Sequence, residues 1–403
     1  MTICPKDKCT ACGACRDVCP RQCISFVADK MDELHPYIDT IKCVECGLCR
    51  KVCPNNTTPK LYYPRKVYAA WSNKLEFRRN SASGGIASEL YKNALSTRKS
   101  CVGVVFDKDK GAVFKPIESE LDIPYVRNSK YTFSNTDGIY KYVRSNLNED
   151  KDVLFIGLPC QVAGLLNFLN KSYEKLTTVD IICHGVAPQS YIKQHIENIE
   201  TRLRRKATSI YFRDPKKQTH LFYFSMYDQN KCFYSKKATA PDIYQLGYHK
   251  ALIYRDNCYK CQYAQASRVA DLTIGDFSGV GRDALWEFGS VNVSCILVNT
   301  LKGEQTLNEI SNQVTYYERP ISEALNYEKQ LKSPSIPHPC RMEFKKKYQE
   351  CGSFVESAHI ALAKDLKKAR RAQLSPKQYI RRFVTMVTTP QMRKIVRNFI
   401  RKF

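Results

Sequence analysis

The segment DNCYKCQYAQASR, residues 256–268, places two cysteines, Cys258 and Cys261, in the second half of the chain. A C-x2-C pair is typical of metal sites, where it supplies half of a zinc knuckle or two ligands of an iron–sulfur cluster. Two further cysteines follow predicted strands, Cys160 in LFIGLPC and Cys183 in VDIIC. Ligands of α/β folds gather at the carboxyl ends of strands, so the four thiols together could hold one 4Fe–4S cluster.

An alternative for the same four residues requires no cluster. Buried free cysteines are common, so Cys160 and Cys183 could be small core residues. Cys258 and Cys261 would then form half of a zinc knuckle or no site at all. The spacing alone leaves both interpretations open.

Around these cysteines the sequence alternates between β-rich and helical segments. Segments rich in β-branched and aromatic residues predict strands at residues 66–71, 100–106, 152–157, 177–183, 209–214, 221–227, 271–277 and 293–299. Apolar residues at helical spacing predict helices at residues 86–95, 161–171 and 191–205. The pattern therefore predicts a mixed α/β body over residues 65–330, followed by a helical, basic region over residues 331–403.

Residues 1–60 contain a repeated motif. CTACGACRDVCP, residues 9–20, and CVECGLCRKVCP, residues 43–54, align at every cysteine and at the proline. In C-x2-C-x2-C-x3-C-P, three cysteines hold one 4Fe–4S cluster and the fourth holds the other. The predicted ligand sets are Cys9, Cys12, Cys15 and Cys53 for the first cluster and Cys43, Cys46, Cys49 and Cys19 for the second. Zinc is the alternative, but zinc sites usually pair two C-x2-C knuckles without a third cysteine at the same spacing.

This N-terminal module resembles the bacterial two-cluster ferredoxins over residues 1–55, and we expect it to be flexible relative to the body. The remaining cysteines show no comparable spacing. We interpret them as spare thiols or core residues: Cys4, Cys23, Cys101, Cys232, Cys295, Cys340 and Cys351.

The body carries a second resemblance, to the coenzyme F-420 hydrogenase/dehydrogenase beta-subunit family. The segments that carry it are GLPCQVAGL (157–165), DIICHGV (180–186), IYFRDP (210–215), CYKCQYAQASRVADLTIGDFSGVG (258–281) and SCILVNT (294–300). They occur in the family's order. The resemblance divides residues 65–330 into an N-terminal and a C-terminal family region, with the boundary near residue 150. The family includes flavin- and iron–sulfur-containing oxidoreductases of the deazaflavin coenzyme and 7-hydroxymethyl chlorophyll a reductase. The combination with a two-cluster module is similar to its fused members.

The resemblance implies FAD in the body beside a 4Fe–4S cluster held by Cys160, Cys183, Cys258 and Cys261. The overall fold class is then α+β: a two-cluster ferredoxin domain, a mixed α/β flavin-binding body and a helical basic tail. Two residues depart from the family pattern, since Ser278 replaces the usual tryptophan after GDF and Leu158 replaces the usual threonine before PC. Both departures bear on the identity of the substrate.

The FAD pyrophosphate is predicted to lie at SASGGIASEL, residues 81–90, because free amides at a helix start suit a phosphate group. A plain N-cap by Ser81 or Ser83 explains the same pattern without a ligand. With SKYTFS, residues 129–134, the resemblance implies these FAD contacts: Ser83, Gly84, Gly85 and Lys130. Lys130 as a solvated surface charge is the alternative.

Three more polar residues are candidates for the flavin or substrate site. Asp276 and Arg282, in IGDFSGVGR, could contact flavin or substrate, and Arg282 is assigned to the cofactor. His184, next to Cys183, could donate a proton, although a lone histidine is often structural. The candidate catalytic residues are thus His184 and Asp276.

The chain carries 64 basic and 39 acidic residues, a net charge of +25. Such a balance favours acidic partners, and we expect a ferredoxin or another acidic redox protein, besides the small-molecule substrate. The N-terminus MTICPKDKC has no apolar signal segment, and no long apolar run occurs, so we expect a cytoplasmic protein. Nucleic-acid binding is a weaker interpretation, because no recognised nucleic-acid-binding motif occurs.

The last residues, 376–403, predict an amphipathic basic helix. Its apolar face could lie on an anionic inner membrane surface, giving a peripheral membrane location, or pack on the protein's own body. Both interpretations remain open.

The function predicted from these features is an FAD-dependent iron–sulfur oxidoreductase. It would pass electrons between a one-electron carrier and a hydride-accepting small molecule, a deazaflavin such as coenzyme F-420 or another substrate. A non-catalytic electron-transfer subunit of a larger redox complex is the alternative.

Overall fold

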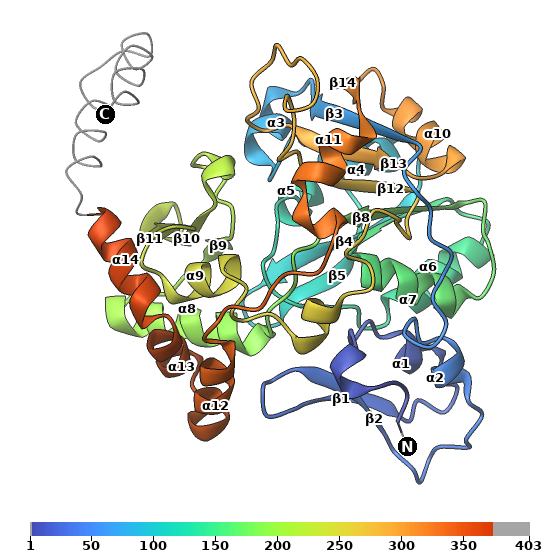
Figure 1. Cartoon of the computed structure of the whole chain (residues 1–403). Helices are drawn as coiled ribbons and strands as arrows, with labels where there is room; N and C mark the ends of the chain where they lie inside the picture. Colours follow the sequence, from blue (N-terminus) through green and yellow to red (C-terminus); the bar gives the residue numbers. More distant parts are fainter. Residues whose placement is uncertain (1, 374–403) are drawn as a thin grey trace.

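The computed structural model describes residues 2–373 of the 403-residue chain, and its centre is a nine-stranded mixed sheet (Figure 1). Across the sheet the strands are β14 (Val314–Arg319), β3 (Lys66–Ser72), β13 (Ser294–Val298), β12 (Leu272–Asp276), β8 (Leu176–Ile181), β7 (Val153–Gly157), β4 (Ser100–Asp107), β5 (Gly111–Ile117) and β6 (Ser134–Asn135). The four neighbours β12, β8, β7 and β4 are parallel. Their carboxyl ends therefore meet at one edge of the sheet.

Helices cover both faces of this sheet. Apolar side chains of α4 (Ile86–Ser96), α5 (Ile123–Val126) and α10 (Leu301–Glu309) pack on one face, and those of α6 (Ile139–Asn148) and α7 (Pro159–Leu169) pack on the other. In β7, Leu154 and Ile156 point to the first face, whereas Val153 and Phe155 point to the second. The whole strand is buried, as expected for a strand with helices on both sides.

A smaller antiparallel sheet lies beside the large one. It consists of β9 (Ser209–Tyr211), β10 (Tyr223–Asp228) and β11 (Lys231–Lys237). The helices that share its core are α8 (Gln189–Leu203), α9 (Ile243–His249), α12 (Arg341–Cys351), α13 (Phe354–Ala361) and α14 (Ala363–Gln373). The ring of Tyr191 stacks on Phe354 at 5.2 Å between centroids, so the helices after residue 331 pack on the body as part of its core.

Short helices complete the body. These are α3 (Leu75–Asn80), α11 (Ile321–Tyr327), η2 (Glu120–Asp122), η3 (Thr219–Leu221), η4 (Asp256–Lys260) and η5 (Lys329–Leu331). Within residues 2–373 no helix is both long and apolar enough to cross a membrane. The predicted amphipathic tail, residues 376–403, lies outside the described residues.

The N-terminal domain is a small unit of two short cysteine-bearing helices and a hairpin. Its elements are η1 (Lys6–Lys8), α1 (Ala14–Val18), β1 (Ile24–Ala28), β2 (Leu34–Ile38) and α2 (Leu48–Lys51). Gly13 and Gly47 occupy the equivalent place in the two repeats, each with positive φ at the start of its helix. This left-handed conformation, which glycine adopts at little cost, lets each cysteine loop turn directly into a helix.

This domain is packed on the body rather than tethered loosely, contrary to the expected flexibility (Figure 1). Arg255 is 1% exposed, and its Nη2 donates to the carbonyl oxygens of Cys9 at 3.2 Å and Leu34 at 3.0 Å. The Glu33 carboxylate accepts from the Asp256 amide at 2.9 Å. Buried charged groups with hydrogen-bond partners in both units hold the two together in one arrangement.

The predicted mixed α/β body is confirmed, and all eight predicted strand segments contain an observed strand. Within residues 2–373, six observed strands were not predicted. β1 and β2 form the N-terminal hairpin and β6 has only two residues, and the other three are β5, β11 and β14. Their sequences GAVFKPI, KCFYSKK and VTYYER contain glycine, proline or several charges, which weaken the local strand signal. These strands form through pairing with neighbours, since β5 pairs with β4 and β14 with β3.

Replacing Arg255 by methionine is expected to destabilise the packing of the N-terminal domain. The carbonyls of Cys9 and Leu34 would lose a buried charged donor, at a cost of about 3 kcal/mol. Denaturant unfolding of anaerobically prepared protein measures the loss. Arg65→Met, at an exposed position, is the matched control. Equal stability of the two variants would contradict the role assigned to Arg255.

Candidate functional site

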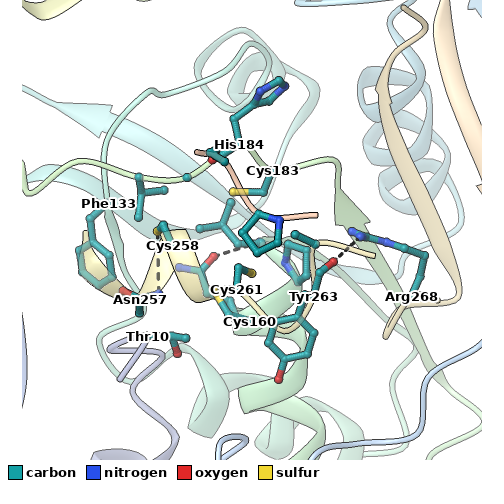
Figure 2. A pocket seen from close by; sticks show the side chains of 18 residues that line it. Thr10, Phe133, Cys160, Cys183, His184, Asn257, Cys258, Cys261, Tyr263 and Arg268 are labelled. Carbon is teal, nitrogen blue, oxygen red and sulfur yellow. Dashed lines mark hydrogen bonds between the residues drawn. The ribbon is translucent and has the colours of Figure 1, made fainter. Parts of the chain in front are cut away.

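Four cysteines from three separate segments line one cavity at the carboxyl edge of the large sheet (Figure 2). Cys160 lies in the first turn of α7, which follows β7, and Cys183 lies two residues after β8. Cys258 lies in η4, and Cys261 directly follows that helix. Because β7 and β8 are neighbouring parallel strands, their ends bring Cys160 and Cys183 together, as predicted.

Burial makes this cavity unfavourable for thiolates without a compensating positive charge. Burial raises the pKa of Cys160 well above its usual range, with neighbouring cysteines adding to the shift. Burial also raises the pKa of Cys183 to about 12 and raises those of Cys258 and Cys261. An iron–sulfur cluster supplies the positive iron charge that thiolates need, so the donor set fits such a group. Within residues 2–373, no three His, Cys, Asp or Glu side chains are grouped closely enough to hold a single metal ion.

A buried ion pair positions the loop that carries Cys258 and Cys261. Arg268 Nη2 donates to Asp180 Oδ1 at 3.0 Å, and both side chains are almost fully buried. Arg268 Nη1 also donates to the carbonyl of Tyr263 at 2.8 Å, and Nε donates to Thr273 Oγ1 at 3.2 Å. Arg268 thereby joins the cysteine loop to β8 and β12. Burial raises the pKa of Asp180, and the Arg268 charge opposes this shift.

The predicted ligands of the N-terminal domain form two groups. A second cavity is lined by Cys19, Cys43, Cys46 and Cys49, the four residues assigned to one cluster. The other four, Cys9, Cys12, Cys15 and Cys53, are all buried in the same small domain. Burial raises the pKa of Cys15, and the charges of Cys12, Cys9 and Cys53 add to this shift, so this set also lies close together. The ligand assignments themselves stay predictions.

Two cysteines outside the repeat lie beside these groups. Hydrogen bonds with the Cys4 thiol lower the pKa of Cys53 to about 7 and also lower that of Cys9. The Sγ atoms of Cys23 and Cys19 are 3.3 Å apart. Sequence spacing gave no signal for either contact, because both residues fall outside the repeated motif.

Cys12 connects the N-terminal domain with the body cavity. A Cβ added to Gly164, in α7, would lie 2.9 Å from Cys12 Sγ, so only glycine admits this thiol so close to the helix. The same thiol is near enough for its charge to raise the pKa of Cys160. The Thr136 hydroxyl donates to the carbonyl of Cys12 at 3.0 Å and helps to fix this loop. One predicted ligand of the first set thus lies beside one predicted ligand of the body set.

The predicted catalytic residues lie at the same edge of the sheet. His184 lines the cavity with a half-exposed side chain, and its Nε2 lies 3.9 Å from Glu328 Oε1. Asp276 ends β12, where its carboxylate accepts from Arg213 Nη1 at 2.7 Å. Sequence reasoning gave neither Arg213 nor Glu328 a role in this region. Arg213 does lie in the quoted segment IYFRDP, whereas no local pattern marks Glu328.

Glu328, unlike Arg213, lies in no segment that the sequence analysis singled out. It is 8% exposed, and Ser278 Oγ donates to its Oε2 at 2.8 Å. Burial raises the pKa of Glu328, and the Asp276 charge adds to this shift, while the Ser278 hydrogen bond opposes it. Ser278, one of the two departures from the family pattern, thus contacts a carboxyl group within the candidate site.

The predicted FAD contacts Ser83 and Gly84 already have hydrogen-bond partners within the protein. Ser83 Oγ donates to the carbonyls of Val293 at 2.8 Å and Gly275 at 3.3 Å, and the Gly84 amide donates to Ser294 Oγ at 2.8 Å. These bonds join the loop to β12 and β13, one residue from Asp276. Gly85, with φ +90°, is the N-cap of α4.

Lys130 and Arg282 have partners within the protein as well. Lys130 Nζ donates to the carbonyls of Val126, Arg127 and Asn128 at 2.9 to 3.2 Å, and burial lowers its pKa to about 7. The Arg282 guanidinium lies 4.8 Å from the ring centre of Tyr327. Their roles as flavin contacts stay predictions.

Comparison with known proteins finds two matching families, one for each part of the chain that carries a cysteine motif. Residues 150–324 match the family described as the C terminus of the coenzyme F420 hydrogenase/dehydrogenase beta subunit, and this range includes all four cavity cysteines. Residues 8–57 match the 4Fe-4S dicluster domain, so the N-terminal domain is an iron–sulfur domain. Both matches are to descriptions of redox proteins, and together they cover the cysteine motifs of the N-terminal domain and of the body.

Among solved structures, the chain is similar to one from the F420-reducing [NiFe] hydrogenase complex of Methanosarcina barkeri, prepared as a xenon derivative. The identity is 16%, the match covers 77% of this chain and 93% of that chain, and the TM-score is 0.41. The search of curated proteins returned no match.

Replacing Cys49 by alanine is expected to lower the iron content of the anaerobically prepared chain by about four irons. Replacing Cys23, which lines the same cavity, should leave the iron content unchanged because Cys23 lies outside the repeated motif. Colorimetric iron determination per chain is the measurement. A loss of iron in Cys23→Ala equal to that in Cys49→Ala would contradict the assigned ligand set.

Proposed function

We propose that the chain is an iron–sulfur flavoprotein that passes electrons between a one-electron carrier protein and a hydride-accepting small molecule. A deazaflavin such as coenzyme F420 is the substrate class that the family description favours. The observation that carries the proposal is the convergence of four distant cysteines on one cavity beside Cys12.

The residues that would hold a third 4Fe–4S cluster are Cys160, Cys183, Cys258 and Cys261. Cys160 lies in the first turn of a helix, Cys183 follows a strand, and Cys258 and Cys261 lie in and directly after a short helix. These positions are fixed by the fold, so little conformational entropy would be lost when a cluster binds. Such a cluster accepts and donates single electrons. Arg268 lowers the cost of the negative charge at Cys183 and Cys261 while it holds the loop in place.

FAD is the proposed two-electron partner of this site. The supporting observations are the N-terminus of α4, an 11-residue helix, and its position beside Asp276. The first amides of a helix lack intrahelical acceptors and attract anionic groups such as a pyrophosphate. Ser83 and Gly84 would act by holding this loop on the sheet, since their side chain and amide already bond to the strands.

The side chains around the cavity mouth would orient the substrate and supply a proton. His184 lines the cavity and its Nε2 lies 3.9 Å from Glu328 Oε1, while Arg213 holds Asp276 through an ion pair. A hydride transfer moves two electrons and one proton together, so a nearby proton donor is needed when single electrons are the source. His184 is the proposed donor, with Glu328 as its charge partner.

Iron and flavin counts on the anaerobically purified chain test the proposal. We expect about twelve irons and about one flavin per chain. Cys160→Ala combined with Cys261→Ala should leave about eight irons, whereas Cys295→Ala, a buried cysteine of β13, should keep all of them. About eight irons in the unmodified chain would contradict the third cluster.

Turnover separates the enzyme from a non-catalytic subunit. The isolated chain, supplied with a reduced viologen dye, should reduce a deazaflavin. Electron uptake from the dye without reduction of any deazaflavin or related acceptor would favour the electron-transfer subunit instead.

A further inference from the structure

The two cysteine groups of the N-terminal domain differ in their distance from the body. Cys12 of the first group lies against α7 and beside Cys160, as described above. Cys46 of the second group is exposed, and it is the one exposed thiol among the twelve predicted ligands. The second group therefore lies at the outer surface of the domain and the first lies at its contact with the body.

The surface around Cys46 is unusually apolar. Ile41 is 96% exposed, and Val44 and Leu48 are also exposed, all within one eight-residue stretch. Exposed apolar residues that cluster in this way, rather than singly, are typical of interaction surfaces. We call these three residues and Cys46 the cysteine-loop face.

Basic residues surround the cysteine-loop face. Arg21, Lys42 and Arg50 are all exposed there, and Arg21 and Arg50 line the same cavity as Cys46. Lys42 pairs with Asp39 at 3.3 Å, and Glu45 is the other acidic residue of the loop. Basic residues thus outnumber acidic ones at this face, which matches the basic excess of the whole chain. An apolar centre with a charged rim is the usual anatomy of a transient protein interface.

We propose that an acidic one-electron carrier protein docks on the cysteine-loop face. The proposal rests on the proposed function and adds the place and chemistry of its protein partner. In each encounter one electron passes between the carrier and the iron–sulfur domain, so that one is oxidised as the other is reduced, and no bond forms or breaks. Complementary charge would speed the encounter, and the exposed apolar side chains would exclude water from the contact.

The hairpin provides a matched control at its other end. Ile24 pairs with Ile38 next to the cysteine-loop face, whereas the turn at residues 29–33 faces the body. Lys30 in this turn is exposed, as is Lys110 on the β4–β5 turn of the body. Reversing these two charges changes the net charge of the chain as much as reversing Arg21 and Lys42 does.

The test measures electron transfer between the full-length, iron-loaded chain and an acidic bacterial two-cluster ferredoxin, by stopped-flow absorbance. Arg21→Glu with Lys42→Glu should lower the second-order rate constant about tenfold at low salt, and the difference should shrink as salt rises. Lys30→Glu with Lys110→Glu should leave the rate nearly unchanged. Iron content and reduction by dithionite confirm that each variant is loaded.

A second pair of variants tests the apolar part of the face. Ile41→Ser should weaken ferredoxin binding, measured on immobilised protein, severalfold. Leu121→Ser, which removes an apolar side chain of the body that is 82% exposed, should not. Neither position contributes to a core, so both variants should fold.

The results of the electron-transfer experiment test the docking face separately from the proposed enzyme activity. Equal rates for both charge-reversed variants and the unmodified chain would overturn the cysteine-loop face and leave the proposed function intact. Electron exchange that depends on Arg21 and Lys42, without reduction of any small molecule, would support the docking face and contradict the proposed enzyme activity.

Discussion

The buried ion pair between Arg268 and Asp180 determines where the second-half cysteines lie. Asp180 is fixed in β8, a central strand, and Arg268 follows the loop of Cys258 and Cys261. The 3.0 Å hydrogen bond from Arg268 Nη2 to Asp180 Oδ1 therefore holds the loop of Cys258 and Cys261 against the carboxyl edge of the sheet. Removing one partner of such a pair typically costs about 3–5 kcal/mol, because the other charge is left buried without compensation. The cavity with four thiols depends on this contact, since Cys160 and Cys183 are already placed by the parallel strands.

A second constraint joins the iron–sulfur domain to this cavity. Arg255, Glu33 and Thr136 make hydrogen bonds across the contact, and Gly164 leaves room for the Cys12 thiol against α7. The consequence is an ordered series of cysteine groups: the cavity in the body, the group that contains Cys12, and the group that contains Cys46. A fixed series of this kind suits single-electron exchange between a buried site and the surface better than a flexible module would. The series of cysteine groups, along which we propose that electrons pass, thus depends on packing as well as on ligand spacing.

Much of this arrangement could be predicted from sequence because it is encoded locally. The repeated C-x2-C-x2-C-x3-C-P motif and the β-rich segments before Cys160 and Cys183 have short-range signals. The structure places Cys160 and Cys183 at one cavity after neighbouring strands, whereas the ligand roles of all these cysteines stay predictions. The contacts of Glu328, Arg255 and Gly164 could not be predicted in this way. Each depends on a partner far away in the chain, such as Ser278 for Glu328 or Cys12 for Gly164. The strand β14 was missed for the same reason, since pairing with β3 stabilises its charged sequence.

The central proposal is that distant thiols converge on a third iron–sulfur site beside the cysteine group that contains Cys12. Electron paramagnetic resonance of the fully reduced, anaerobically prepared chain tests it most directly. We expect about three unpaired spins per chain, with spin–spin coupling that changes when Cys160 and Cys261 are replaced by alanine. About two spins, with a spectrum that is the same in the unmodified and the replaced chain, would contradict it.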